Sequence, residues 1–323
     1  GDGETRFGAC LLAKGLSTQS ARRLMPTVRR HVKIRLVHHY KRHEMLKKSL
    51  QRFEDIPNLH QKINAVSDVI NNRPSPLRKY DQIYMKAADM VLQAELVQGL
   101  IDNKDVIFMG DGDSMAITFA YLSSLGLINK GPKRSVVLDF DERIVRAIQR
   151  FAREKCLEEV VEAYLYNVVD PVPLHLSPSF NAFYINPPYG STNAGQSAIV
   201  FIDRCLELCL SECTGCVILP YDGERVWTRT AMYEIQSYAI EVGLVISEML
   251  REIHSYHLDD DPNLLSSTLI FERVCNHLTR FQNSVIPLET LRNFYGREVQ
   301  EIPHYIRAVT PNGNLEYFED KEW

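Results

Sequence analysis

Residues 186–189 read Asn-Pro-Pro-Tyr and follow directly on the apolar segment 180–185. Two successive prolines fix φ and remove two backbone donors, so the carbonyl groups of this turn cannot all enter regular hydrogen bonding. The Asn186 side chain and the Pro187 carbonyl then present a rigid set of acceptors, with the Tyr189 ring beside them. Such acceptors suit an amino group whose nitrogen is alkylated. The alternative is a structural turn with a packed tyrosine.

A glycine-rich turn is the second candidate site. The apolar segment 105–109 leads into Gly-Asp-Gly-Asp-Ser, and residues 115–125 have helical spacing. A strand, a glycine turn and a helix start form the nucleotide-binding unit of open α/β sheets, because glycine lets the backbone approach a ligand. We therefore expect cofactor contacts from the members of this turn, which are Gly110, Asp111, Gly112, Asp113 and Ser114.

Acidic residues follow the next apolar segment, 135–138. A carboxylate at the end of the second strand of such a fold accepts hydrogen bonds from the two hydroxyls of a ribose. The alternative for each acid is to cap the helix expected over 142–155. We assign ribose binding to Asp139 and helix capping to Asp141.

Gly110-x-Gly112, Asp139 and the Asn-Pro-Pro-Tyr turn resemble, in order and spacing, the class I S-adenosylmethionine-dependent methyltransferases. The turn itself is similar to the motif of amino-methyltransferases that modify adenine N6 in nucleic acid. This resemblance extends over residues 100–275 at the level of the fold. It implies S-adenosyl-L-methionine as the cofactor and places Asn167 or Asp170 near the adenine amino group.

A more local resemblance connects Tyr80-Asp81-Gln82, the glycine turn and residues 137–143 with the catalytic domain of the branched-chain polyamine synthases. Those enzymes have the same fold but transfer aminopropyl groups from decarboxylated S-adenosylmethionine. The resemblance is strongest over residues 80–155. The chain departs from that family at the fourth strand, where the family tends to carry Asp-Pro-Pro and this chain has Asn186 with Tyr189.

The alternation of apolar and helical segments predicts an α/β fold: a Rossmann-like, seven-stranded, mostly parallel sheet with helices on both faces, plus a helical N-terminal region. We divide the chain into a basic, mostly helical region (1–76), a transferase domain (77–275) and a C-terminal extension without an assigned role (276–323). A helix is expected over 80–100. The expected strands are 105–109, 135–138, 160–166, 180–185, 216–219, 242–249 and 267–272.

The composition is that of a globular chain of 323 residues, with 45% hydrophobic and 24% charged residues. No apolar run reaches the length of a membrane span, and no signal peptide precedes the fold, so we expect a cytoplasmic protein with no membrane partner. Seven cysteines suit a reducing compartment, where thiols need not pair.

Four cysteines lie close together, at Cys205, Cys209, Cys213 and Cys216, and the last three match a pattern found in iron–sulfur enzymes. Residues 197–210, however, have amphipathic helical spacing that places the first two cysteines on one face. Buried cysteine packs like a small hydrophobic residue. We therefore expect these cysteines in the core and expect no metal.

Positive charge is concentrated between Arg22 and Arg52, where eleven Lys or Arg residues accompany one acidic residue, while the whole chain has a net charge of −4. A basic helical region of this kind neutralises phosphates, and the binding that it supports weakens steeply with salt. This predicts a nucleic-acid partner, DNA, held by residues 22–52. The alternative is a solvated helix face that balances the acidic remainder of the chain.

Two further loops are candidates for substrate binding. The first follows the fifth expected strand and contains Tyr221 and Asp222. The second, residues 254–262, interleaves histidine and aromatic residues with acids and contains His257, Asp259 and Asp260. The alternative for both loops is ordinary turn chemistry at the surface.

These features support two reactions, and we favour methylation of an exocyclic amino group, adenine N6 in DNA. Asn186 and the Pro187 carbonyl accept the amine hydrogens, and Tyr189 stacks on a base flipped out of the duplex. The protein then has mainly to align nitrogen, methyl and sulfur. A neutral asparagine favours this reaction, because it cannot act as the base that a protonated polyamine nitrogen needs.

The alternative reaction transfers an aminopropyl group from decarboxylated S-adenosylmethionine to a polyamine such as spermidine. Asp111 and Asp113 favour it, because they would repel the carboxylate of the intact donor. The acidic run 259–261 favours it too, because it would attract a polycation. A third hypothesis is a binding module that keeps the fold without catalysis.

Overall fold

The computed structural model describes residues 53–176, 178–222, 225–258, 261, 263–296, 304–309 and 316–320. By its internal contacts the chain separates into two compact units, 1–56 and 57–323. The basic region 22–52 lies outside the described residues, and so do Asp259 and Asp260. The division of the chain at residues 76 and 275 stays a prediction.

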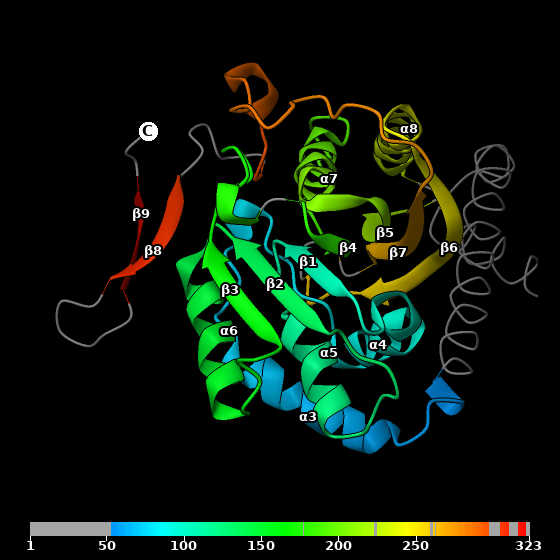
Figure 1. Ribbon diagram of the computed structural model, residues 1–323, viewed down its shortest axis with the longest axis vertical. Helices are drawn as coiled ribbons and strands as arrows, with labels where there is room; N and C mark the ends of the chain where they lie inside the picture. Colours follow the sequence, from blue (N-terminus) through cyan, green and yellow to red (C-terminus); the bar gives the residue numbers. More distant parts are fainter. Residues whose placement is uncertain are drawn as a thin grey trace, which may run out of the picture. The chain divides into compact units, whose positions relative to one another are not determined.

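A single seven-stranded sheet forms the centre of the second unit, in the order β3-β2-β1-β4-β5-β7-β6 (Figure 1). Five neighbouring strands are parallel, and β7 runs antiparallel to both β5 and β6. This confirms the predicted Rossmann-like sheet. The strands are β1 (Asp105–Met109), β2 (Arg134–Asp139), β3 (Val161–Leu165), β4 (Phe180–Ile185), β5 (Cys209–Pro220), β6 (Leu244–Ser255) and β7 (Leu265–Arg273).

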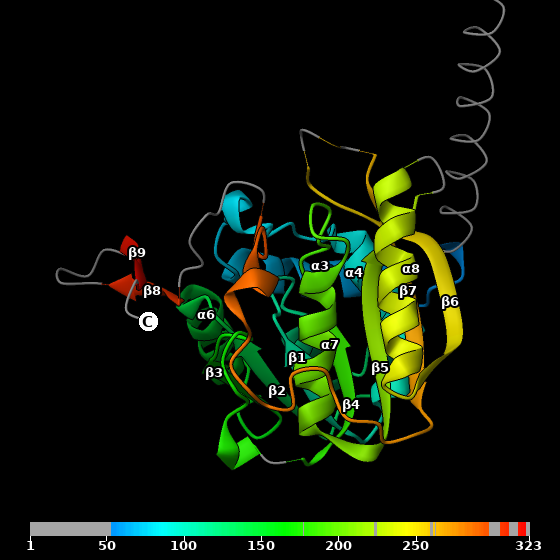
Figure 2. The same ribbon diagram turned by 90° about the horizontal axis from the view of Figure 1, so that it is seen from above.

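Helices cover both faces of this sheet (Figures 1 and 2). One face carries α4 (Ala87–Ile101), α5 (Met115–Ser124) and α6 (Glu142–Glu154), and α3 (Leu59–Asn72) packs against all three. The other face carries α7 (Gln196–Leu208) and α8 (Val226–Glu241). Because both faces are covered, the central strands are almost continuously buried, as in β1 from Val106 to Met109.

Helix α6 shows how the local sequence determines where a helix begins and which of its faces is buried. Asp141 precedes the helix, and its side chain accepts a hydrogen bond from the Arg143 backbone at 3.0 Å, which confirms the predicted cap. Ile144, Ile148 and Phe151 recur at helical spacing and are buried. Their burial directs the helix onto β2 and β3, so Asp141 stays at the carboxyl edge of the sheet.

The helix expected over 80–100 begins only at Ala87. The short 3₁₀-helix η1 (Arg78–Tyr80) ends at Asp81, whose φ of 54° is left-handed, and the chain then runs extended to Lys86. Met85 forms an antiparallel bridge with Tyr256, and the Lys86 amide donates to the Ser255 carbonyl at 3.3 Å. Contacts with the end of β6 and the residue after it thus hold Met85 and Lys86 outside the helix.

The fifth strand begins at Cys209, seven residues before the expected start, and its register against β4 shifts between Phe180 and Ala182. All four clustered cysteines are buried, which confirms that they pack in the core. Cys205 lies on α7, and the other three lie on β5, although Cys209 was expected on the preceding helix. Within the part of the chain that the structure describes, no three His, Cys, Asp or Glu side chains are grouped so that they could hold a metal ion.

The chain after β7 returns to the carboxyl edge of the sheet. It forms η3 (Leu288–Leu291) and later a hairpin of β8 (Tyr305–Val309) and β9 (Glu316–Asp320), whereas η2 (Leu174–Leu176) lies between β3 and β4. Val169 accepts a backbone hydrogen bond from Ile286 at 2.9 Å, and Phe140 accepts one from Ile306 at 3.0 Å. Residues from the expected C-terminal extension therefore contact the loops after β2 and β3.

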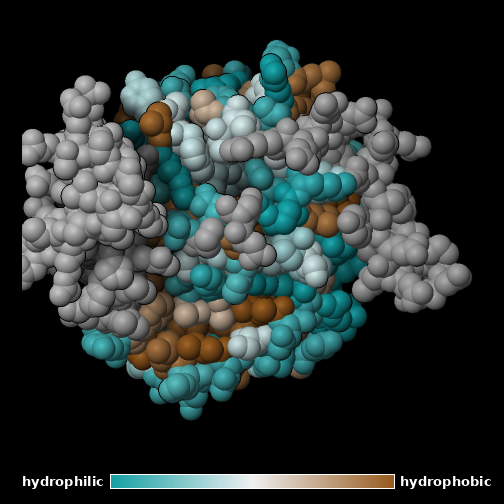
Figure 3. Space-filling view, turned by 180° about the vertical axis from the view of Figure 1, so that it is seen from behind, coloured by the Kyte–Doolittle hydropathy of each residue, from teal (hydrophilic) through white to brown (hydrophobic). Residues whose placement is uncertain are grey.

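The described surface is mixed in character. On the face opposite to the view of Figure 1, hydrophilic residues predominate and apolar ones gather mainly toward the lower edge (Figure 3). Elsewhere, Val226, Tyr233 and Ile240 form an exposed apolar stripe at intervals of seven along α8. None of the helices in the described ranges combines the length and the apolar character that a membrane span requires.

The first prediction concerns the packing of β4 on β5. A Cβ at Gly215 would lie 2.0 Å from the Phe183 ring, which is fully buried. We expect Gly215→Ala to lower the free energy of unfolding by about 1–3 kcal/mol, because the ring has no free volume into which to move. Chemical denaturation measures this change.

The matched control is Gly99→Ala on α4, where an added Cβ meets only the Lys130 amine at 4.0 Å. A helical glycine replaced by alanine in open space is expected to stabilise by up to about 1 kcal/mol. Equal effects of the two substitutions would contradict the packing described here.

Candidate active site

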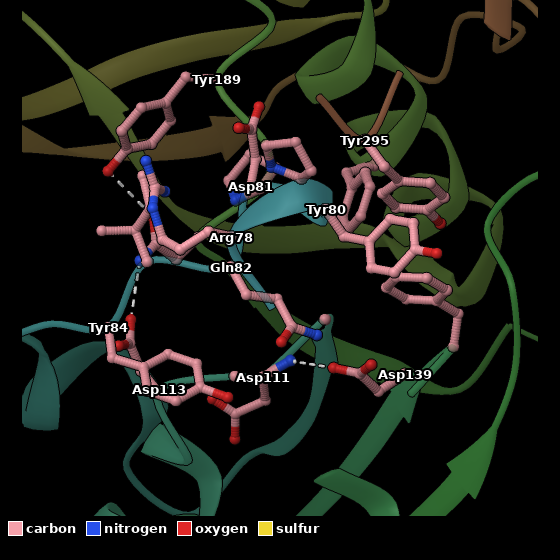
Figure 4. A pocket seen from close by; sticks show the side chains of 18 of the residues that line it. Arg78, Tyr80, Asp81, Gln82, Tyr84, Asp111, Asp113, Asp139, Tyr189 and Tyr295 are labelled. Atoms are coloured by element: carbon pink, nitrogen blue, oxygen red, sulfur yellow. Dashed lines mark hydrogen bonds between the residues drawn. The ribbon is translucent and has the colours of Figure 1, made fainter. Parts of the chain in front are cut away.

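A cavity of about 630 Å³ lies beyond the carboxyl ends of β1, β2 and β4. This is where ligands bind in open α/β sheets. Its wall combines the glycine turn, the residues after β2 and β4, the extended segment after η1, and Tyr295 (Figure 4). Of the residues singled out in the sequence it includes Gly110, Asp111, Gly112, Asp113, Asp139, Asn186, Pro187 and Tyr189.

Asp139 ties two turns together at the floor of the cavity. One carboxylate oxygen accepts the Asp111 amide at 3.0 Å, and the other accepts the Asp141 amide at 2.9 Å. Burial, and next the charge of Asp141, raise the pKa of Asp139 to about 7. The carboxylate faces the cavity at the end of the second strand, and its binding to a ribose stays a prediction.

Asp111 points its carboxylate at the start of α5. Its oxygens accept the Met115 amide at 2.7 Å and the Ala116 amide at 2.9 Å, so it satisfies two free donors of the first helical turn. Burial raises the pKa of Asp111 well above its ordinary value. Ser114 occupies the N-cap position with a left-handed φ of 60° but makes no capping bond and does not line the cavity.

Asp113 joins three segments of the wall. Its carboxylate accepts the Met85 amide at 2.6 Å and the Asn186 side-chain amide at 2.7 Å. Arg73 approaches the carboxylate to 3.9 Å. Burial raises the pKa of Asp113, while the Arg73 charge opposes this rise. The glycine turn, the extended segment and the Asn-Pro-Pro-Tyr turn are thus held by one side chain.

The amide of Asn186 is oriented by this contact. Its nitrogen donates to Asp113, and its oxygen accepts from the Tyr189 hydroxyl at 3.3 Å. The same hydroxyl lies 2.6 Å from that of Tyr256, whose ring meets the Tyr189 ring edge-on. Figure 4 shows Tyr189 and Asp113 on the same side of the cavity. The polar atoms of the turn therefore already belong to a hydrogen-bonded group.

Tyr84 carries a buried hydroxyl that has no hydrogen-bond partner among the described residues. Its ring packs against Gly112, and the Arg73 guanidinium lies 4.4 Å from the ring centre. Burial raises the pKa of this phenol well above its ordinary value, and the charges of Asp141 and Asp139 add to the rise. A buried polar group without a partner is unusual.

One end of the cavity is aromatic. Phe140 stacks on Tyr295 with ring centres 4.3 Å apart, and Tyr80 meets Phe140 edge-on at 5.9 Å (Figure 4). Asn167 lies behind this wall: its oxygen accepts from the Tyr295 hydroxyl at 2.8 Å, and its amide donates to the His304 carbonyl at 2.6 Å. Asn167 therefore holds the C-terminal segment and does not line the cavity.

Three of the residues expected to bind substrate do not line the cavity: Tyr221, Asp222 and His257. The Tyr221 ring lies under the Arg251 guanidinium at 4.3 Å. Asp222 lies 3.4 Å from the guanidinium of Arg225. His257 reaches the wall only through its backbone amide, which donates to the Tyr84 carbonyl at 3.4 Å.

Several cavity residues were not among the expected ones. Arg78, Lys79 and Asp81 come from the segment around η1. Asp261, from the loop after β6, also lines the cavity and belongs to the acidic run 259–261 that was expected to attract a polycation. Gln82 lines the cavity as well and donates to Asp141 at 3.0 Å. The motif Tyr-Asp-Gln at 80–82 indicated the resemblance to the polyamine synthases. Because a helix was expected there, these residues were not predicted to line the cavity.

The strand order, with a reversed seventh strand and a cavity at the carboxyl edge, defines a Rossmann-like fold of the methyltransferase type. Residues 61–304 match the family of the Branched-chain polyamine synthase A C-terminal domain. Because this match spans more than half of the chain, the protein belongs to that family.

Curated relatives and a solved structure agree with this assignment. The chain is 26% identical over 209 residues to the N(4)-bis(aminopropyl)spermidine synthase of Thermococcus kodakarensis, covering 64% of this chain and 55% of the relative. It is 31% identical over 187 residues to that of Thermus thermophilus, covering 57% and 50%. The chain thus spans about half the length of these relatives.

The branched-chain polyamine synthase of Thermus thermophilus, solved in complex with N4-aminopropylspermidine and 5'-methylthioadenosine, shares the fold. Its TM-score is 0.60 at 23% identity, and the alignment covers 71% of this chain and 67% of that one.

The expected methylation of adenine N6 in DNA is therefore wrong. That hypothesis gave most weight to four residues of one turn, whereas the family match extends over residues 61–304. Rigid hydrogen-bond acceptors beside a tyrosine suit any amino group that is alkylated. The Asn-Pro-Pro-Tyr turn therefore does not distinguish a nucleobase substrate from a polyamine substrate. The DNA partner was inferred from the basic residues 22–52, which lie outside the described residues; the relatives do not support it, and it is not retained.

The pKa of Asp139 gives a prediction for stability. Its folded value of about 7 exceeds the ordinary value, so the folded state holds this proton more tightly than the unfolded chain. The proton on Asp139 therefore stabilises the folded state fully below about pH 4, and this stabilisation is lost as the pH rises to about 7. The free energy of unfolding of the wild type minus that of Asp139→Asn should therefore fall, by on the order of 2 kcal/mol, from pH 5 to pH 8, because only the wild type loses this stabilisation.

Urea denaturation at several pH values measures this difference. Burial also raises the pKa of Asp203 to about 7, but Asp203 is present in both proteins and cancels from the comparison. If the wild-type value minus the variant value stays constant or rises with pH, the described environment of Asp139 is contradicted.

Proposed function

We propose that this protein transfers an aminopropyl group from decarboxylated S-adenosylmethionine to an amino group of a polyamine such as spermidine. The observation that carries the proposal is membership of the polyamine synthase family, with relatives that are N(4)-bis(aminopropyl)spermidine synthases. The solved relative holds 5'-methylthioadenosine, which is what remains of such a donor once its aminopropyl group has left.

The charge of the cavity supports cationic ligands. Its wall carries five carboxylates and two cationic side chains. The carboxylates are Asp81, Asp111, Asp113, Asp139 and Asp261, and the cations are Arg78 and Lys79. Both the sulfonium donor and a polyamine are positively charged, and a bound cation lowers the pKa of a nearby buried carboxyl group. Ligand binding would therefore ionise the acids that burial leaves partly protonated.

The two ends of the cavity suit the two ends of the donor. Phe140 and Tyr295 offer aromatic surface for an adenine, and Asp139 stands where a ribose is held in folds of this class. Tyr84 adds an unpartnered hydroxyl on the same wall. In this arrangement the sulfonium would lie between the glycine turn and Asn186, next to the acceptor amine.

The reaction needs few chemical groups from the protein. The acceptor nitrogen attacks the propyl carbon bonded to sulfur; the nitrogen–carbon bond forms, the carbon–sulfur bond breaks and its electron pair stays on sulfur. The positive sulfur makes this carbon electrophilic, so the chain contributes alignment, exclusion of water and removal of the amine proton. Only a neutral amine can attack, so a proton must leave the acceptor first.

The direct test incubates purified protein with decarboxylated S-adenosylmethionine and spermidine. We expect 5'-methylthioadenosine and a spermidine bearing an added aminopropyl group, detected by mass spectrometry. Calorimetry should show that decarboxylated donor binds at least about tenfold more tightly than the intact form, because a carboxylate near Asp111 and Asp113 costs a few kcal/mol. Equal binding of both donors without transfer would overturn the proposal in favour of a module that has the fold but no catalysis.

A second test removes one acid from the site. Asp113→Asn keeps the shape of the side chain but loses its charge, so we expect the preference for the decarboxylated donor to fall about tenfold. Asp105→Asn is the matched control, because Asp105 pairs with Lys133 at 3.2 Å away from the cavity. The proposed place of the donor is wrong if both variants keep the wild-type preference.

A further inference from the structure

A buried arginine lies behind the glycine turn. Arg73 directly follows helix α3, and because Pro74 comes next, its backbone is extended, with φ −75° and ψ 152°. The Arg73 side chain is 6% exposed and does not line the cavity. From the sequence this residue was placed before the transferase domain, which was expected to begin at residue 77, and no motif marked it as part of the site.

The Arg73 guanidinium contacts two segments of the cavity wall. Its Nη1 donates to the Asp113 carbonyl at 3.3 Å and lies 3.9 Å from the Asp113 carboxylate. Its Nη2 donates to the Met85 carbonyl at 3.5 Å, and its central carbon lies 4.4 Å from the centre of the Tyr84 ring. Because Asp113 lines the cavity and Arg73 does not, a ligand there meets the carboxylate before the guanidinium.

Asp113 differs from the other buried acids of the cavity in having a counter-charge. A buried carboxyl group takes up a proton readily, because burial disfavours the charged form. Among the described residues Asp111 and Asp139 form no ion pair, and burial raises the pKa of Asp111 well above its ordinary value and that of Asp139 to about 7. Burial also raises the pKa of Asp113, but the Arg73 charge opposes this rise. An arginine stays charged even when it is buried.

The other titratable groups near Asp113 do not supply a positive charge. Burial raises the pKa of four neighbouring phenols well above its ordinary value, so they stay neutral: Tyr84, Tyr184, Tyr189 and Tyr256. Asp111 in the same turn repels a charge on Asp113 when it is itself ionised. Of the described charged groups, Arg73 is therefore the one that favours the ionised form of Asp113.

An ionised carboxylate attracts a cation, whereas a protonated one does not. We propose that Arg73 is a positioning residue for the donor: it keeps the Asp113 carboxylate ionised and fixed in the cavity wall, and it thereby sets the preference of the cavity for a sulfonium cation over a neutral ligand. This inference rests on the proposed aminopropyl transfer, in which the sulfonium lies next to the glycine turn. Arg73 acts through Asp113 and does not touch the donor itself.

The test compares two ligands that share an adenosine part and differ in charge. Calorimetry measures the affinity of the full chain and of Arg73→Met for decarboxylated S-adenosylmethionine, which is a cation, and for 5'-methylthioadenosine, which is neutral. At about pH 6.5 we expect Arg73→Met to bind the cation about tenfold more weakly, with its affinity for the neutral ligand within about twofold of wild type. A role of Arg73 in packing alone would weaken the binding of both ligands alike.

The pH dependence of donor binding gives a second sign to check. Without the Arg73 charge the pKa of Asp113 rises, so in the variant this carboxylate ionises at a higher pH than in wild type. Above that pH it has no counter-charge and attracts the donor at least as strongly as in wild type. The donor affinities of the two proteins should therefore converge or cross between about pH 6.5 and pH 9, while the affinity for 5'-methylthioadenosine stays unchanged in both.

The matched control is Lys62→Met on the same helix. Lys62 is 1% exposed and pairs with Glu95 on α4, and neither residue lines the cavity. This variant also loses a buried cation, but it should keep the wild-type ratio of the two ligand affinities at each pH. Equal changes of that ratio in Lys62→Met and Arg73→Met would overturn the inference.

Two further variants keep the inference testable if Arg73→Met does not fold. In Asp113→Asn, the added change Arg73→Met should lower the ratio of the two affinities no further, because the asparagine has no charge to maintain. This double variant also leaves no buried charge of the pair without its partner. Arg73→Lys keeps the charge and should keep a ratio within about threefold of wild type.

The outcomes separate this inference from the proposed function. A wild-type protein that makes no aminopropylated product overturns the proposed function and the role of Arg73 with it. If the wild type is active and Arg73→Met keeps the wild-type preference for the cation at about pH 6.5, the role of Arg73 alone is overturned. The same holds if Arg73→Met lowers the ratio in the Asp113→Asn background as much as in wild type, because Arg73 would then not act through Asp113.

Discussion

The buried carboxylate of Asp113 connects the parts of the site that come from distant positions in the chain. It accepts the Met85 amide and the Asn186 side chain, so one group positions the extended segment after η1 and the turn after β4 against the glycine turn. Buried charge is costly unless it is paired, and here three partners, including Arg73, share it. The orientation of Asn186 and therefore the contact of Tyr189 with Tyr256 both depend on this carboxylate.

Most of the sheet could be predicted from sequence because its central strands are short apolar runs that end at glycine or proline. The bounds of β1 and β4 agree with the predicted 105–109 and 180–185. The extended conformation of residues 81–86 could not be predicted, because it depends on pairing with Tyr256, far along the chain. Local spacing favoured a helix there, and tertiary hydrogen bonds overrode it.

The site was only partly accessible to the same reasoning. The glycine turn, Asp139 and Asn186 were found because each follows directly on a recognisable strand. Tyr295 was missed, since its stacking on Phe140 joins residues that no local pattern connects. The reaction was misjudged because the chemistry of Asn186 was considered as that of an isolated side chain. In the structure it is one member of a hydrogen-bonded group that also contains Asp113, Tyr189 and Tyr256.

The stacking of Tyr295 on Phe140 also bears on the order in which the molecule can mature. Strand β7 ends at Arg273, so every strand of the central sheet precedes the aromatic residue that closes the cavity. Chains are synthesised from the N-terminus, and domains can begin to fold during synthesis. A nascent molecule could therefore complete its sheet while the adenine-sized end of the cavity still lacks one wall. Competence for ligand binding would then follow completion of the central sheet rather than accompany it.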